Sequence, residues 1–258
     1  MKQSIDGLPD WRHLALDETD STNSDALRQF ADGDPGHLWI TADRQTSGRG
    51  RRGRTWESPT GNLHASLLLV DPAPLQQLAT LPLLAAVALH DALIELVPHL
   101  ADNIAIKWPN DLLHDGAKIS GILLETANNS SGELGLALGF GVNCGLSPSV
   151  ALYPANALSQ DADTVSPKSA FSTLAQSIAR WLDIWDRGAG FGVVREQWLL
   201  RATGIGGPIT ARFPDHEISG TFRDLDADGL MLLELRDGTI ERISAADIFL
   251  GNSNPQRA

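Results

Sequence analysis

The chain has 258 residues, enough for one large domain and a small one, and its 42% hydrophobic and 20% charged residues are typical of a globular protein. Its 20 Lys and Arg residues against 32 Asp and Glu residues give a formal net charge of -12, which argues against a general nucleic-acid binder. The single cysteine, Cys144, excludes an intramolecular disulfide and a multi-cysteine metal site.

The N-terminal segment carries no targeting signal. No apolar core follows Lys2, so residues 1–15 are expected to be a short leader and not a signal peptide. No apolar run along the chain approaches the roughly 18 residues that span a bilayer. We therefore expect a protein of the reducing cytoplasm with no membrane association.

Helices and strands alternate between residues 21 and 201. N-cap residues in 21–25 predict a helix start, the turn at 114–116 (His-Asp-Gly) predicts a hairpin, and proline directly after Ser166 predicts the start of a long helix. Helices are expected at 21–30, 81–96, 166–187 and 191–201, and strands at 37–42, 62–70, 103–108, 112–126 (two strands) and 133–142.

The sequence pattern changes after Gly204. Short segments alternate apolar and polar residues, and the Asp-Gly pairs at 228–229 and 237–238 mark turns between them. Strands are expected at 208–213, 217–224, 229–235 and 239–244. This pattern predicts a small antiparallel barrel over residues 204–258, after a main domain over residues 1–203.

The run 47–56 (Ser-Gly-Arg-Gly-Arg-Arg-Gly-Arg-Thr-Trp) places four arginines within six residues of an acidic chain. Arginine binds phosphate or carboxylate through paired hydrogen bonds, and the glycines let the backbone approach such an anion. The run also fits the G-x-G-x-x-G dinucleotide pattern, but Pro59, Gly61 and a strand follow where that fold needs a helix. A mobile loop that closes over a phosphate and an acyl group is the favoured interpretation, and a solvated basic loop or an RNA-contacting patch is the alternative.

Two lysines lie at predicted strand ends. Lys107 begins the run 107–111 (Lys-Trp-Pro-Asn-Asp), and Lys118 is followed by apolar residues and a glycine. Alternate side chains of a strand face one side, so these cations can line a pocket, although ordinary surface lysines are the alternative. Asn143 and the polar run 21–23 are further candidates for a site, with backbone capping as their alternative role.

Together and in this order, these segments resemble the biotin protein ligases. The matching segments are 20–23 (Asp-Ser-Thr-Asn), Gln45 with 48–54 and Trp56, 58–59 with 61–63, 107–111, 118–123 and 141–143. The resemblance spans roughly residues 19–145, and the C-terminal barrel is similar to the small terminal domain of that family. The arginine loop combined with the run 107–111 makes the resemblance specific.

The resemblance implies an α+β fold, with a mixed, mainly antiparallel sheet and flanking helices related to class II aminoacyl-tRNA synthetases, plus a C-terminal SH3-like β-barrel. It implies that the biotin carboxylate attacks the α-phosphate of ATP to give biotinyl-5′-AMP and pyrophosphate, and that a lysine of an acceptor protein then takes the biotin. ATP, Mg²⁺ and biotin are the expected small molecules, and the biotin carboxyl carrier domain of a carboxylase is the expected acceptor.

The resemblance also implies roles for single residues. Three cations would stabilise the charge at the α-phosphate: Lys118, Arg49 and Arg51. The implied biotin-binding residues are Ser21, Thr22, Asn23, Gln45, Gly48, Arg49, Gly50, Arg51, Lys118 and Gly121. The implied ATP-binding residues are Arg51, Arg54, Trp56, Lys107, Asn110, Asp111 and Asn143, with Trp56 over the adenine. No cage of side chains is expected for Mg²⁺, which would come with ATP near Asp111.

Other interpretations stay open beside this one. A lipoate–protein ligase shares the fold and the adenylation chemistry, but a polar pocket favours the ureido ring of biotin over the apolar dithiolane of lipoate. A nucleic-acid-binding module that uses the arginine loop is disfavoured by the acidic composition. Because only 20 residues precede Ser21, no N-terminal DNA-binding unit and no DNA binding are expected. Monomer and homodimer are both open.

Overall fold

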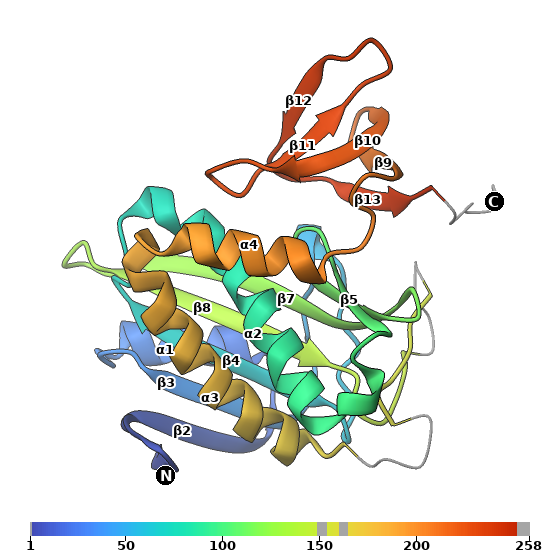
Figure 1. The fold of residues 1–258 in the computed structure, drawn as a ribbon. Helices are drawn as coiled ribbons and strands as arrows, with labels where there is room; N and C mark the ends of the chain where they lie inside the picture. The colour runs from blue at the N-terminus through green and yellow to red at the C-terminus, as the bar shows by residue number, and fades with distance from the viewer. Residues whose placement is uncertain (1, 149–153, 160–164, 252–258) are drawn as a thin grey trace.

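Eight strands form one large sheet in the order β1-β2-β3-β4-β8-β7-β6-β5 (Figure 1). The computed structural model describes residues 2–148, 154–159 and 165–251. All neighbouring strands of the sheet run antiparallel except β2 and β3, which are parallel. The strands are β1 Gln3–Ile5, β2 Leu8–Thr19, β3 Leu38–Gln45, β4 Leu63–Val70, β5 Ile104–Lys107, β6 Asp111–His114, β7 Ala117–Asn128 and β8 Leu134–Val142.

Residues 3–5 and 8–19 are strands of this sheet, so the expectation of a short leader over residues 1–15 is wrong. β1 and β2 form an antiparallel hairpin at the edge, and β2 pairs with β3 from Arg12 to Thr19. The segment is fixed further by Asp34, whose carboxylate accepts hydrogen bonds from Arg12 at 2.6 and 2.8 Å and from Lys2 at 2.6 Å. The sequence does not predict β2 as a strand because its open face carries polar side chains, which interrupt the apolar pattern.

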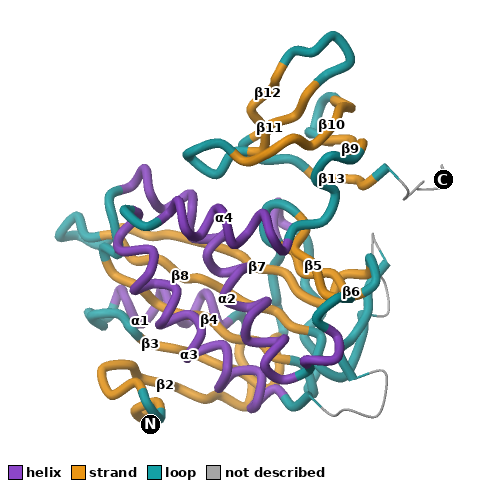
Figure 2. The backbone as a smooth tube through the Cα atoms, in the orientation of Figure 1, coloured by secondary structure: helices purple, strands orange, loops and turns teal. Residues whose placement is uncertain are grey.

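Helices cover both faces of the large sheet. α2, α3 and α4 lie over one face, and α1 lies over the other, where it contacts β3, β4 and β8 (Figures 1 and 2). The helices are α1 Thr22–Ala31, α2 Leu81–Leu96, α3 Pro167–Trp185 and α4 Phe191–Arg201, and short 3-10 helices lie at Arg51–Gly53, Leu75–Thr80, Pro98–Leu100 and Asp186–Gly188. The N-cap expected for α3 is present, because the Ser166 hydroxyl accepts a hydrogen bond from the Ser169 amide at 3.0 Å.

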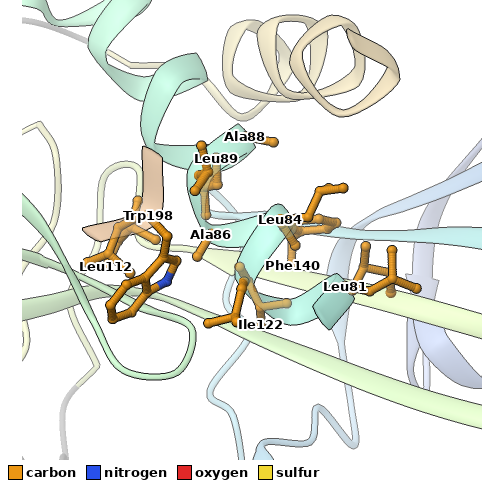
Figure 3. Close-up of a cluster of buried hydrophobic side chains, with 14 of the residues drawn as sticks. Leu81, Leu84, Ala86, Ala88, Leu89, Leu112, Ile122, Phe140 and Trp198 are labelled. Atoms are coloured by element: carbon orange, nitrogen blue, oxygen red, sulfur yellow. The ribbon is translucent and has the colours of Figure 1, made fainter. Parts of the chain in front are cut away.

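Strand alternation divides the core into two clusters. Leu67 and Leu69 of β4 belong to the large cluster under α2 and α3, whereas Leu68 between them packs with Ala26 and Phe30 of α1. Figure 3 shows the large cluster where α2 meets the sheet, and its labelled members are Leu81, Leu84, Ala86, Ala88, Leu89, Leu112, Ile122, Phe140 and Trp198. Both faces of β4 are therefore buried, and its sequence is nearly continuously apolar.

The central helix α2 is buried on most of its surface. Together with the preceding 3-10 turn, the stretch Leu75–Leu96 is long and apolar enough to cross a membrane by length and composition. In the structure 72% of an 18-residue window within that stretch is buried inside the protein. It is the core helix of a folded domain, which passes the same test as a membrane span.

The C-terminal segment forms a second, five-stranded sheet in the order β12-β11-β10-β9-β13, with all neighbours antiparallel. Its strands are β9 Pro208–Arg212, β10 Glu217–Leu225, β11 Met231–Glu234, β12 Ile240–Ile243 and β13 Asp247–Leu250. Four of them were expected from the alternation, and β13 was not. The sheet packs against α4, where the ring centroids of Trp198 and of Phe222 in β10 lie 6.4 Å apart. It agrees with the expected SH3-like barrel (Figure 2).

Candidate active site

A cavity of about 410 Å³ opens where the two sheets meet. Its walls come from the start of α1, the end of β3, the arginine loop, the connection from β5 to β6, the first half of β7, the end of β8 and the segment around the start of β13. The parallel pairing of β2 and β3 places the start of α1 beside the end of β3, with Thr19 opposite Gln45. Chain segments from residue 21 to residue 248 thus contribute to one site.

The floor of the cavity is formed by the backbone of glycines in β7 and β8. Gly121 of β7 lies opposite Gly141 of β8, and both line the cavity. A methyl group at Gly141 would lie 2.4 Å from the Trp56 ring, and one at Gly139 would lie 2.4 Å from Asn23 Oδ1. These positions are glycines because two side chains from other elements rest directly on the sheet there.

One wall is a network of buried polar side chains. Gln45 Oε1 accepts hydrogen bonds from the Thr22 amide at 2.9 Å and from the Thr22 hydroxyl at 3.1 Å, while Gln45 Nε2 donates to the Ser58 hydroxyl at 2.8 Å. The Ser66 hydroxyl lies 2.7 Å from the Thr22 hydroxyl and 2.6 Å from Asn23 Oδ1. Fixed donors and acceptors of this kind suit a small polar ring of a ligand.

The arginine loop is anchored at both ends by carboxylates. At one end the Arg49 guanidinium binds both Glu125 oxygens, at 2.9 and 3.1 Å. At the other end Arg52 and Arg54 bind Asp247 at the start of β13. Between them, Arg51 lies inside, and its hydrogen-bond partner is Asn110 Oδ1 at 3.3 Å. Arg51 is therefore the loop arginine with no carboxylate ion pair among the described residues, and it lines the cavity.

Positive charge is concentrated at the cavity although the chain is acidic. Five cations line it against three carboxylates, namely Arg49, Arg51, Arg54, Lys107 and Lys118 against Glu57, Asp111 and Asp247. Burial lowers the pKa of both Arg51 and Lys107 below their usual values, and the charges of Asp111 and Asp247 oppose this shift in each case. Lys118 Nζ lies 2.8 Å from Asp111 Oδ1. An anionic ligand would relieve the repulsion among these cations.

The structure brings fourteen of the sixteen predicted site residues to this cavity: Ser21, Thr22, Asn23, Gln45, Arg49, Gly50, Arg51, Arg54, Trp56, Lys107, Asp111, Lys118, Gly121 and Asn143. Gly48 and Asn110 lie behind the lining. A methyl group at Gly48 would lie 2.4 Å from the Trp56 carbonyl oxygen, so this glycine lets the loop fold back on itself. Asn110 donates to the Ile122 carbonyl oxygen at 2.8 Å and supports Arg51 from beneath.

Several residues at the cavity were not predicted. Glu125, Ser66 and Ser58 hold predicted residues in place, and Asp247 lines the cavity from the second sheet. The glycines around Phe140 were a visible signal, since alternating glycines in a strand suggest close approach from above. Nothing in the local sequence marks Asp247.

Comparison with known proteins shows the family of this chain. A profile of the Biotin/lipoate A/B protein ligase family matches residues 16–143, and a profile of the biotin protein ligase C terminal domain matches residues 204–251. A biotin–[acetyl-CoA-carboxylase] ligase of Paracoccus denitrificans is 39% identical over 245 residues, which is 92% of this chain and 99% of the relative. The chain belongs to the biotin protein ligase family.

Other biotin protein ligases cover most of the chain. The bifunctional ligase/repressor BirA of Bacillus subtilis is 33% identical over 93% of this chain, which spans 74% of that relative. The solved structure of the biotin protein ligase from Aquifex aeolicus in complex with biotin and ATP has a TM-score of 0.77 at 26% identity, and the match covers 93% of this chain and 99% of that one. The predicted α+β fold is thereby confirmed for this biotin protein ligase.

The ligase offers carboxylate oxygens near Lys118, at Asp111. Among residues 2–148, 154–159 and 165–251, no group of three or more His, Cys, Asp or Glu side chains could hold a metal ion. Asp111 provides carboxylate oxygens, the ligand type that Mg²⁺ prefers, but one of them is bound to Lys118. The residues fit a metal that arrives bound to a nucleotide, and they offer no dedicated metal cage.

Proposed function

We propose that this chain is an ATP-dependent biotin–protein ligase that forms biotinyl-5′-AMP and then transfers biotin to a lysine of a carrier protein. The observation that carries the proposal is that one cavity joins a buried polar wall to a cluster of five cations. The polar wall suits the ureido ring of biotin, and the cations suit a carboxylate beside a triphosphate.

The first step brings two anions together. The carboxylate oxygen of biotin attacks the α-phosphorus of ATP, a P–O bond forms, and pyrophosphate leaves with the electron pair of the broken bond. Arg51 and Lys118 would neutralise charge at the α-phosphate, with Arg49 on the biotin side. The Arg51 guanidinium already lies in the cavity with only an amide partner, so it is available to a phosphate oxygen. Mg²⁺ bound to the nucleotide would balance further charge on its phosphates.

The second step uses the energy of the mixed anhydride. The amine of an acceptor lysine attacks the acyl carbon, an amide bond forms, and AMP leaves. The arginine loop would cover the adenylate until the acceptor arrives and so limit its hydrolysis. The name of the Paracoccus relative gives acetyl-CoA carboxylase as its acceptor. We propose the biotin carboxyl carrier domain of such an enzyme as the acceptor here.

The residue assignments form part of the proposal. The biotin side comprises Ser21, Thr22, Asn23, Gln45, Gly48, Arg49, Gly50, Arg51, Lys118 and Gly121. The nucleotide side comprises Arg51, Arg54, Trp56, Lys107, Asn110, Asp111 and Asn143. Residues 1–203 would act as the catalytic domain and residues 204–258 as the small domain. A cytoplasmic location and the lack of DNA binding stay predictions, and the oligomeric state stays open.

The proposal is tested by incubating the purified protein with ATP, Mg²⁺ and either biotin or lipoate, and measuring pyrophosphate release and the adenylate. Adenylate from biotin alone, followed by labelling of a carrier domain, is the expected result. Adenylate from lipoate alone would move the chain to the lipoate ligases of the same fold. If neither acid reacts, the proposed ligand is wrong.

A further inference from the structure

The small C-terminal sheet supplies part of the active-site wall. Ala246, Asp247 and Ile248, at the start of β13, line the same cavity as the arginine loop. β13 lies on the side of the small sheet that faces the large one (Figure 1). Residues almost 200 positions apart along the chain are therefore direct neighbours here.

Asp247 is the centre of this contact. Its carboxylate lies 3.1 Å from Arg52 Nη1 through Oδ2 and 3.2 Å from Arg54 Nη1 through Oδ1, and Arg54 Nη2 makes a second contact to Oδ2. Arg52 Nη2 also reaches the Ala245 carbonyl oxygen at 3.5 Å. The Asp247 side chain is only 15% exposed, so water screens these pairs less than it screens ordinary surface pairs.

The Asp247 carboxylate is anionic at neutral pH. Burial raises the pKa of this carboxyl, but the hydrogen bond from Arg54 and the charges of Arg54 and Arg52 outweigh burial and hold the pKa below its usual range. The same negative charge also acts on Arg51 and Lys107, two cations of the cavity. One acidic side chain of the small sheet thus faces most of the positive charge on the nucleotide side.

Apolar packing does not hold the segment of the loop that carries Arg52 and Arg54. Residues 52–55 are exposed and carry no buried apolar side chain, and glycines at 50 and 53 leave the backbone flexible. Backbone hydrogen bonds close the loop on itself, from the Gly50 amide to the Arg54 carbonyl oxygen at 2.7 Å and from the Trp56 amide to the Gly48 carbonyl oxygen at 2.9 Å. They fix the shape of the loop. Arg49 on Glu125 and the Trp56 ring on the sheet place its two ends, and Asp247 holds the segment between them.

We propose that Asp247 is a positioning residue for nucleotide binding. Its carboxylate binds Arg52 and Arg54 and thereby holds the loop over the cavity, with Arg51 directed inward, before ATP binds. This inference rests on the proposed adenylation function for its kinetic part. The small sheet then contributes to nucleotide binding, because it carries the carboxylate that positions the loop.

The test compares Asp247→Asn with Asp247→Glu and with Glu234→Gln. Asn keeps the shape of the side chain and removes the charge, whereas Glu keeps the charge. Glu234 pairs with Arg223 on the same sheet and does not line the cavity, so Glu234→Gln is a matched loss of an arginine–carboxylate pair. Amide hydrogen–deuterium exchange of residues 48–56 without ligand is measured first, and KM values for ATP and biotin follow.

The expected result for Asp247→Asn is faster exchange across 48–56, unchanged exchange in β9 and β10, a KM for ATP raised about tenfold, and a KM for biotin changed by less than about twofold. Asp247→Glu should restore most of the loop protection, and Glu234→Gln should change neither readout.

Unchanged loop exchange in Asp247→Asn, or a lower KM for ATP, would overturn the proposal, because the carboxylate would then only fasten the sheet or compete with phosphate. Faster exchange in β9 and β10 together with the loop, and equal shifts of both KM values, would also overturn it in favour of a purely structural role. The exchange measurement needs no substrate, so failure of the adenylation function would be seen separately in the wild-type protein.

Discussion

Asp111 Oδ1 lies 2.8 Å from Lys118 Nζ, across the hairpin formed by β6 and β7. The pairing of these strands shifts between Leu112 and Leu113, and this irregularity brings the two side chains together at the mouth of the cavity. The carboxylate fixes the ammonium where the proposed adenylate linkage would form. A cation held before the ligand arrives needs no reorganisation during the reaction.

Replacing Lys118 by Ala should lower kcat/KM for adenylate formation by about 100-fold or more while the protein stays folded, because a positive charge at the α-phosphate is lost. Pyrophosphate release measures the rate, and circular dichroism measures the fold. Lys168→Ala at an exposed position of α3 is the control. Wild-type turnover in Lys118→Ala would remove Lys118 from the mechanism.

Replacing Gly141 by Ala should weaken nucleotide binding, because the new methyl group would lie 2.4 Å from the ring of Trp56, a proposed nucleotide-side residue, and would displace the indole from the floor of the cavity. Calorimetric titration with a non-hydrolysable ATP analogue gives the affinity, and the tryptophan fluorescence spectrum reports the displaced ring. Gly192→Ala serves as the control, since a methyl group there meets nothing within 4 Å. An unchanged affinity and spectrum would show that Trp56 does not rest on the floor.

Replacing Ser66 by Ala should reduce the affinity for biotin about tenfold without direct loss of a ligand contact. The Ser66 side chain is fully buried, and its removal leaves Thr22 and Asn23 each without one hydrogen-bond partner, which costs roughly 1–3 kcal/mol in total. Titration of biotin into the variant and into Ser172→Ala, an exposed serine of α3, separates this effect from a general loss of hydroxyl groups. Equal affinities would mean that the wall keeps its shape without Ser66.

Asp34 should make the stability of the ligase depend on acid pH. Burial raises the pKa of Asp34, but hydrogen bonds from Arg12, Lys2 and the Gly36 amide outweigh burial and lower the pKa from the ordinary 3.8 to about 2. Because the folded-state pKa is the lower one, the stabilisation is complete above the ordinary value and is lost as the pH falls from about 4 to about 2.

Asp34→Asn should therefore lower the free energy of unfolding by about 1–2 kcal/mol at pH 7, after allowance for screening by solvent, and by much less near pH 2. Urea unfolding at several pH values measures the difference, with Asp17→Asn at an exposed position as the control. A difference between wild type and Asp34→Asn that is the same at pH 7 and pH 2 would contradict the assignment.

Elements with strong local signals were predicted from the sequence. α2 has a long apolar run that ends before Pro98, and the β6–β7 hairpin has the Asp115-Gly116 turn, with both residues at positive φ as such a turn requires. β1 and β2 were missed because their open face is polar, and β13 was missed because four residues are too short to show a period.

The residues of the site likewise fall into those that the sequence predicts and those that it does not. Residues within the motifs were found because the resemblance to a family carries them as contiguous runs. Glu125 and Asp247 were not found, because each acts on an arginine that is 76 or about 190 residues away in the chain. Such partners are set by the tertiary fold, and a single sequence does not show which carboxylate will meet which cation.

The parallel pairing of β2 with β3 has a consequence for how the large sheet forms. A slip of one residue between β2 and β3 would turn apolar side chains to the wrong face, so the core prevents it. A slip of two residues keeps every side chain on its own face, so the alternation of apolar and polar residues does not by itself prevent it. That slip would, however, carry Gln45 roughly 7 Å from Thr22 and break both hydrogen bonds between them. The hydrogen bonds of the polar wall thus also favour the native register of β2 and β3. A protein with these strands shifted by two residues would lack the wall and would not bind the ligand.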